Sequence, residues 1–331
     1  MTATTKSVVS SERARPRLAG LISQETVIAI SLIVLMLGVG LVNPRFLAER
    51  NISSILLGNA YVAVAAIGMT MVIISGNIDI SVGSLIGVLA VISGQLAVAG
   101  YPIWFSWLAP LIVGGLVGAL NGFFVAYLRI PSIVTTLGMA SILKGGLISV
   151  TNGAWISDLP PGYALAQMRP LGIPMPIYFM IVLTIVAAFW MRYSPSGRAI
   201  YAVGGNAEAA RLSGISERGT IMRVFIINGV IIGIASVLFS TQLSVIQSTV
   251  PPNLELLIIT ASVVGGVSIL GGIGTAIGST LAAILLSAIG SALVFVNISP
   301  YWLRAVQGLL ILSTVLFDLF RRHRQMIDMR G

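Results

Sequence analysis

The chain has 331 residues, of which 56% are hydrophobic and only 9% are charged, and its mean hydropathy is +1.01. Soluble domains carry about 25% charged residues, so this composition excludes an ordinary soluble globular protein. The net charge of +9 comes from basic residues at the ends of apolar runs, without an aromatic-interleaved basic stripe, which argues against a nucleic-acid partner. The absence of cysteine excludes disulfides and thiolate metal sites.

Apolar runs follow one another along almost the whole chain. A helix needs about 20 apolar residues to cross the ~30 Å hydrocarbon core of a bilayer. We therefore predict an all-α, polytopic integral membrane protein with about ten transmembrane helices, although nine or eleven also fit the hydropathy. The predicted spans are residues 26–42, 53–74, 82–99, 105–128, 133–151, 177–193, 224–243, 254–270, 275–297 and 303–320.

The basic residues predict how the chain is oriented, because cytoplasmic loops of membrane proteins are enriched in Lys and Arg. With the N-terminus inside, most arginines fall on the cytoplasmic side, and the outer side receives only Arg45, Arg50 and Arg169. Both termini are then cytoplasmic. This places an N-terminal tail at residues 1–25, a membrane domain at residues 26–320 with a cytoplasmic loop at residues 194–223, and a C-terminal tail at residues 321–331.

Groups that carry enzymatic chemistry are sparse. The chain has no phosphate-binding Gly-rich loop ending in Lys and Ser or Thr, so it lacks a P-loop site for nucleotides. The single histidine, His323, lies in the basic C-terminal segment without a cluster of carboxylates, which excludes a Ser–His–Asp triad and argues against a metal site. We therefore expect a protein that is not an enzyme and that holds no cofactor.

Polar and charged residues within or between the spans are candidates for a translocation path or gate, because a charge at bilayer depth costs roughly 2.5–3.5 kcal/mol. Asp79 and Glu255 can alternatively serve as helix caps or first-turn acids. The amides inside spans can alternatively form hydrogen bonds that hold helices together. The candidates are Asn77, Asp79, Ser81, Asn121, Asn228, Gln242 and Glu255.

The loop at residues 194–223 differs in kind from the other connections. Pro195 and Gly197 break the preceding span, whereas residues 207–212 (AEAARL) are strong helix formers. Gly214 follows at a C-cap-like position. A short helix on the positively charged side of the protein favours docking of a partner over a solvated loop.

Four stretches in a fixed order resemble a known family over most of the chain, from about residue 43 to 320. They are residues 76–84, 130–138, 197–206 continued by 213–215, and 254–255 continued by 263–275. The chain resembles the permease subunits of ribose-type bacterial ABC sugar importers, which include permeases for rhamnose, xylose and autoinducer-2. Residues 155–160 are similar to autoinducer-2 and rhamnose permeases, whereas residues 249–253 depart from the more glycine-rich sequence of the relatives.

The resemblance implies a subunit of a complex in the bacterial inner membrane. Its partners would be a cytoplasmic ABC ATPase, a second permease subunit (identical or homologous), a periplasmic substrate-binding protein, a sugar-like small molecule and the lipid bilayer. The ATPase would dock on a coupling loop formed by Gly197, Arg198, Gly204, Gly205, Asn206, Glu208, Ala209, Ala210, Arg211, Ser213, Gly214 and Ile215. Hinges are expected at Gly76, Gly83, Gly265, Gly266, Gly271, Gly272 and Gly274.

Two other functions remain open on the sequence alone. A secondary transporter could use Asp79 or Glu255 as its proton site. An ABC permease for branched-chain amino acids or nucleosides would share much of this architecture. The sequence does not specify the transported solute.

Overall fold

A computed structural model describes residues 23–249 and 251–328, with the backbone alone for residues 317–319 and 321–328. Within this part of the chain the regular structure is helical, and the only β-type pairing is a single bridge between Ile156 and Ile246. The helices are α1 (Gln24–Val42), α2 (Glu49–Gly58), α3 (Ala60–Ile74), α4 (Val82–Val98), α5 (Ile103–Ala126), α6 (Ser132–Thr151), α7 (Met175–Tyr193), α8 (Pro195–Gly205), α9 (Ala207–Leu212), α10 (Glu217–Ser240), α11 (Leu254–Val264), α12 (Ala276–Phe295) and α13 (Trp302–Asp328). Short 3₁₀ helices are η2 (Pro44–Leu47), η3 (Leu165–Gln167) and η4 (Pro170–Gly172).

Among the described residues, seven helical segments are long and apolar enough to cross a membrane: α1, Glu49–Ile74 (α2 together with α3), α5, α6, α7, α10 and α12. Three shorter apolar helices cover Val82–Val98, Leu254–Val264 and Trp302–Leu316. The predicted all-helical, multi-pass architecture is therefore confirmed. These segments fall where the ten spans were predicted, but a count of ten crossings stays a prediction.

Two predicted spans are interrupted in the structure. The run at residues 53–74 is divided at Asn59, which separates α2 from α3. The run at residues 254–270 is helical only to Val264, and an irregular segment continues to Thr275, where α12 is capped. Irregular backbone at membrane depth is tolerated where protein buries it.

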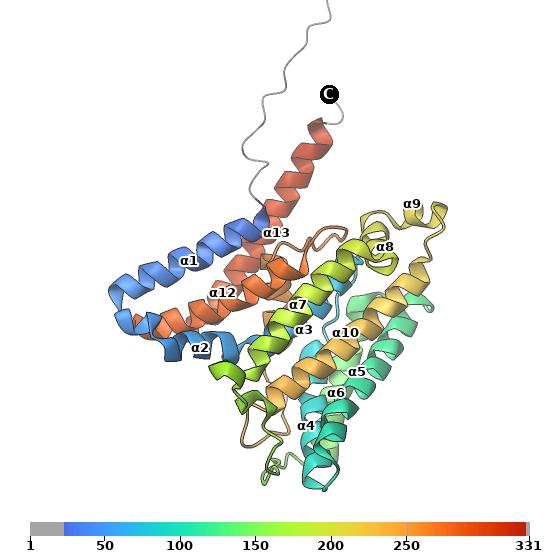
Figure 1. Cartoon of the computed structure of the whole chain (residues 1–331). Coiled ribbons are helices and arrows are strands. Elements are labelled where there is room, and N and C mark those ends of the chain that lie inside the picture. The colour runs from blue at the N-terminus through green and yellow to red at the C-terminus, as the bar shows by residue number, and fades with distance from the viewer. Residues whose placement is uncertain (1–22, 250, 329–331) are drawn as a thin grey trace, which may run out of the picture.

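The centre of the bundle is formed by α3 and α10 (Figure 1). Every residue of α3 except Tyr61 is buried. Small residues bring α5 and α10 together, since a Cβ at Gly114 or Gly118 of α5 would overlap backbone carbonyls of α10. By contrast, α1 and α6 expose most of their apolar side chains, as helices at the rim of a membrane bundle do.

The connections gather at two ends of the bundle. One end carries α8, α9 and the C-terminal end of α13, and the other carries the loop at residues 152–174 (Figure 1). In that loop Tyr163 is only 1% exposed, and its hydroxyl lies 2.8 Å from Ser93 Oγ of α4 and 2.9 Å from Ser240 Oγ of α10. The loop is thus anchored to two core helices rather than lying loosely over them.

Candidate functional site

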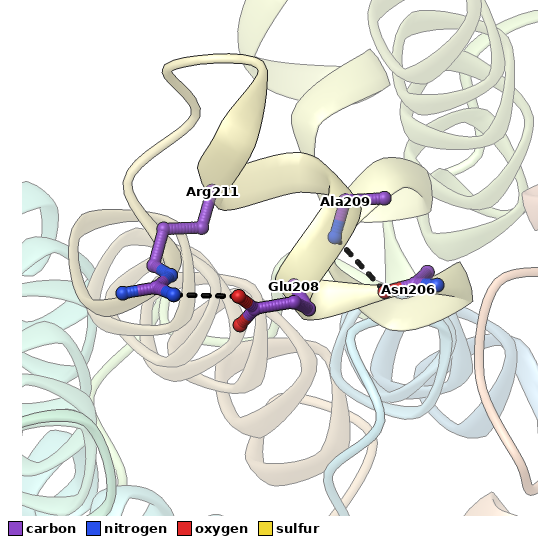
Figure 2. Close-up of polar contacts among 4 residues, drawn as sticks. All are labelled: Asn206, Glu208, Ala209 and Arg211. Atoms are coloured by element: carbon purple, nitrogen blue, oxygen red, sulfur yellow. Dashed lines mark hydrogen bonds and ion pairs between the residues drawn. The ribbon is translucent and has the colours of Figure 1, made fainter.

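The predicted coupling loop folds into two short helices, each with a side-chain N-cap. Ser194 caps α8 by accepting the N–H of Gly197 at 2.8 Å, and Pro195 occupies the first helical position, where its missing donor costs nothing. Asn206 ends α8 and caps α9, because its Oδ1 accepts the N–H of Ala209 at 2.9 Å (Figure 2). The sequence therefore encodes a defined two-helix element between α7 and α10.

The end of α9 is a Schellman motif built on Gly214, which has a φ of 79°. The Gly214 N–H donates to the Arg211 carbonyl, and the Ile215 N–H donates to the Ala210 carbonyl, both at 3.0 Å. Ser213 is the C-cap residue. The helix stop predicted at Gly214 is present with the backbone geometry that glycine adopts most readily.

The faces of α9 differ in their exposure. Glu208 and Arg211 form an exposed ion pair on one turn, and Ala209 is exposed (Figure 2). Ala210 is only 4% exposed, so it packs inside this chain and does not offer the surface contact expected of it. Leu212, which the sequence analysis did not select, is 79% exposed. The sequence could have identified Leu212, because it is a large apolar residue at the end of a short, polar helix.

The rest of the coupling loop is packed against the bundle. Gly204 lies against the carbonyl of Ile74 at the end of α3, so closely that a Cβ at residue 204 would overlap that oxygen. The same carbonyl accepts the N–H of Gly272 at 2.9 Å. A second contact joins α8 to the segment before α12, since the Tyr201 hydroxyl donates to the Gly274 carbonyl at 2.9 Å. Gly205 is the exception, because a Cβ at this residue would meet no atom within 4 Å.

At the start of α8, Gly197 and Arg198 hold the turn that follows α7. A Cβ at Gly197 would lie 2.5 Å from the Met191 Cα, so glycine permits this close approach. The Arg198 guanidinium donates to the Tyr193 carbonyl at 3.1 Å and thereby satisfies a carbonyl of the last turn of α7. Both residues therefore fix the direction of α8 relative to α7.

The glycines predicted as hinges occupy two kinds of position. Gly83 and Gly265 are sites of close packing, where a Cβ would lie 2.5 Å from Glu255 Oε2 and from the Ser279 backbone, respectively. The others have positive φ angles: Gly76, Gly266, Gly271, Gly272 and Gly274. Their role as hinges stays a prediction.

Four of the seven polar residues predicted for the path lie together in one buried network. The backbone N–H and hydroxyl of Ser81 donate to Asp79 Oδ1 at 2.9 and 2.6 Å. Asn228 of α10 donates to Asp79 Oδ2 at 2.9 Å, and Asn121 of α5 donates to Ser81 Oγ at 3.1 Å. Ser81 is the N-cap residue of α4, so Asp79 orients the cap instead of forming it.

This network is closed in the present conformation, since all four side chains are at most 2% exposed. The Oδ1 atoms of Asn121 and Asn228 are buried without a hydrogen-bond partner in the part of the chain that the structure describes. A Cβ at Gly68 of α3 would overlap Asn228 Oδ1, so the network is enclosed on that side as well. The arrangement joins α3, α4, α5 and α10 at one point.

The other three predicted residues lie outside the network. Asn77 donates to Ser75 Oγ at 3.1 Å, within its own turn. Gln242 donates to the Leu57 carbonyl at 3.3 Å, away from Asp79. Glu255 lies in the first turn of α11 against Gly83, close to the start of α4. Whether any of the seven lines a path for solute stays a prediction.

Comparison with known proteins gives the family. Residues 51–315 match the model described as "Branched-chain amino acid transport system / permease component". The chain is 35% identical over 299 residues to the autoinducer 2 import system permease protein LsrC of Salmonella typhi, which covers 89% of this chain and 86% of that protein. The chain belongs to this family of ABC import permeases. No solved structure matches it.

Further LsrC proteins show the same relationship. That of Enterobacter sp. (strain 638) is 35% identical over 83% of this chain and 81% of its own length, and that of Photorhabdus laumondii is 32% identical over 89% of both. The chain is therefore a transport component and not an enzyme, and a proton-driven secondary transporter is not favoured. Permeases of this kind work with an ATPase, a partner permease and a substrate-binding protein.

Proposed function

We propose that this chain is the permease subunit through which autoinducer-2, or a chemically similar sugar-like solute, enters the bacterial cytoplasm across the inner membrane. The observation that carries the proposal is the 35% identity to LsrC over 89% of the chain. The name of the matching family model points to branched-chain amino acids, which makes them the second candidate class of substrate.

An uptake experiment tests this proposal. The chain would be expressed with the ATPase, binding-protein and permease genes that neighbour its own, in cells that lack autoinducer-2 uptake, and depletion of the medium would be measured. We expect ATP-dependent removal of autoinducer-2. Uptake of leucine without autoinducer-2 would support the second class, and uptake by the chain alone under a pH gradient would contradict the ABC mechanism.

We further propose that α8 and α9 form the docking site of the ATPase. The exposed face of α9, with Glu208, Ala209, Arg211 and Leu212, offers a charged pair beside an apolar contact at one end of the bundle. Docking of a partner on this face would remove the exposed side chain of Leu212 from water, which favours association. The packing of Gly204 on Ile74 gives this surface a direct connection to the core.

Both termini are proposed to be cytoplasmic, on the same side as α9. The arginines support this orientation, because Arg192 lies at the end of α7 next to α8 and Arg218 lies in the first turn of α10 after α9, whereas Arg169 lies in the loop at residues 152–174 at the opposite end. The chain has no cysteine, so single cysteines can be labelled without background. Ser213→Cys should react with an impermeant maleimide only from inside, and Leu171→Cys, at a site 95% exposed, only from outside.

A further inference from the structure

A surface cavity of about 550 Å³ lies where α1, α7, α8 and α12 meet, apart from the buried Asp79 network. Its polar lining consists of Glu25, Arg192, Arg198, Tyr201 and Thr275. Two arginines therefore line one cavity at the end of the bundle that carries α8 and α9. Neither the family nor the proposed transport reaction assigns a role to this cavity.

The two arginines keep donors available. Among the described residues no carboxylate lies within 4.0 Å of either guanidinium. Arg198 donates one hydrogen bond to the Tyr193 carbonyl, and the guanidinium carbon of Arg192 lies over the Tyr193 ring, 5.5 Å from the ring centroid. A guanidinium has five N–H donors, so most remain free for an anion with several acceptor oxygens.

Glu25 is the one acid in the cavity lining, and it has its own partner. Its Oε1 accepts the hydroxyl of Thr275, the residue that caps α12. The positive end of a helix dipole favours a carboxylate there. Glu25 is thus held by α12 and does not neutralise the arginines, although its charge weakens the attraction of the cavity for a second anion.

The surroundings of the cavity are apolar and exposed. Ile277 of α12, which lines it, is 42% exposed, and Ile185 and Phe189 of the neighbouring α7 are 63% and 65% exposed. Exposed apolar side chains on membrane-spanning helices contact acyl chains. Basic pockets between such helices at the cytoplasmic face suit anionic headgroups.

We propose that this cavity binds a phosphate group, held by Arg192 and Arg198, with an anionic phospholipid headgroup as the source that the apolar surroundings favour. The phosphodiester would lie between the two guanidiniums, and the acyl chains would lie along α7 and α12. A bound lipid would then bridge the start of α8 and the start of α12.

Lipid binding to the full-length chain in detergent tests the proposal. Apparent dissociation constants would be measured by native mass spectrometry for phosphatidylglycerol, for phosphatidylcholine with the same acyl chains, and for inorganic phosphate. We expect phosphatidylglycerol to bind most tightly, and Arg192→Gln or Arg198→Gln to weaken it about tenfold each through the loss of charged hydrogen bonds. Arg218→Gln, at an exposed arginine of the same end outside the cavity, is the matched control and should leave the constant unchanged.

A third variant, Glu25→Gln, removes the negative charge that opposes an anion in the cavity and should therefore tighten phosphatidylglycerol binding. Because misfolding would weaken binding, this gain separates an effect on the site from an effect on folding. Inorganic phosphate that binds as tightly as the lipid, with the same dependence on both arginines, would assign the site to a soluble phosphate. Equal binding of phosphatidylglycerol by wild type and the arginine variants would overturn the proposal. If Arg192→Gln and Arg198→Gln lower the recovery of the ATPase on copurification but leave lipid binding unchanged, the proposal is also overturned, since the arginines would then belong to the ATPase interface.

Discussion

Gly204 of α8 and Ile74 of α3 meet backbone to backbone, with the Ile74 carbonyl also bound by the Gly272 N–H at 2.9 Å. The candidate docking element and the most buried helix of the bundle are therefore in contact without an intervening side chain. A displacement of α8 by a partner must move the end of α3 and the glycine-rich segment before α12.

Gly204→Ala should impair both stability and transport, because its Cβ would overlap the Ile74 oxygen. Overpacking of this kind costs about 1–3 kcal/mol. The matched control is Gly205→Ala, since the next glycine has nothing within 4 Å of its Cβ position. Thermal unfolding and uptake at equal membrane levels measure the effect; equal loss in both variants would contradict the packing argument.

Gly214→Val should weaken association with the ATPase without preventing membrane insertion. A left-handed conformation costs a residue with a Cβ roughly 1–2 kcal/mol, and a β-branched side chain resists it most. Gly214→Asn is the control, because asparagine tolerates this conformation. Recovery of ATPase on copurification is the measurement, and full recovery with valine would mean that the Schellman motif is not needed.

Two neighbouring alanines separate a docking contact from internal packing. Ala209 is exposed and Ala210 is 4% exposed. Ala209→Trp should lower ATPase copurification and leave the thermal unfolding of the chain unchanged. Ala210→Trp should lower both, because the ring cannot fit inside the chain. If Ala209→Trp retains all of the ATPase, this face of α9 is not the docking surface.

Asp79→Asn should preserve the fold and reduce uptake. The new amide can keep its oxygen toward Ser81, and Asn228 can turn its unpartnered Oδ1 toward the new N–H, so the network loses charge without losing hydrogen bonds. Asp79→Ala leaves buried donors unpaired and should cost about 1–3 kcal/mol of stability. Uptake by Asp79→Asn equal to that of wild type at equal membrane levels would show that the carboxylate has only a structural role.

Local features of the site could be predicted from the sequence, whereas its tertiary contacts could not. Asn206 and Gly214 predict the two ends of α9, because helix caps depend on residues that are adjacent in the chain. The burial of Ala210 and the contact of Gly204 with Ile74 depend on how α8 lies against α3. Hydropathy carries no information on that arrangement.

The Asp79 network shows the same contrast between residues that the sequence identifies and contacts that it does not predict. Each polar residue could be selected individually, since polar groups are costly in apolar spans. That Asp79 meets Asn228, 149 residues away in sequence, follows from the packing of α10 beside α4 and from the close approach that Gly68 allows. The division of the second span at Asn59 was also missed, because α2 and α3 are both helical and the apolar run continues through the break.

The contacts between α4 and α10 have a mechanical consequence. Asn228 is tied to Asp79 just before α4 begins, Ser236 donates to the Ile86 carbonyl at 3.1 Å, and Tyr163 bridges Ser93 and Ser240 near the far end. These three connections oppose rotation of either helix about its axis and sliding of one helix along the other. We therefore expect α4 and α10 to move together when the protein opens and closes, with bending in the segments before and after them.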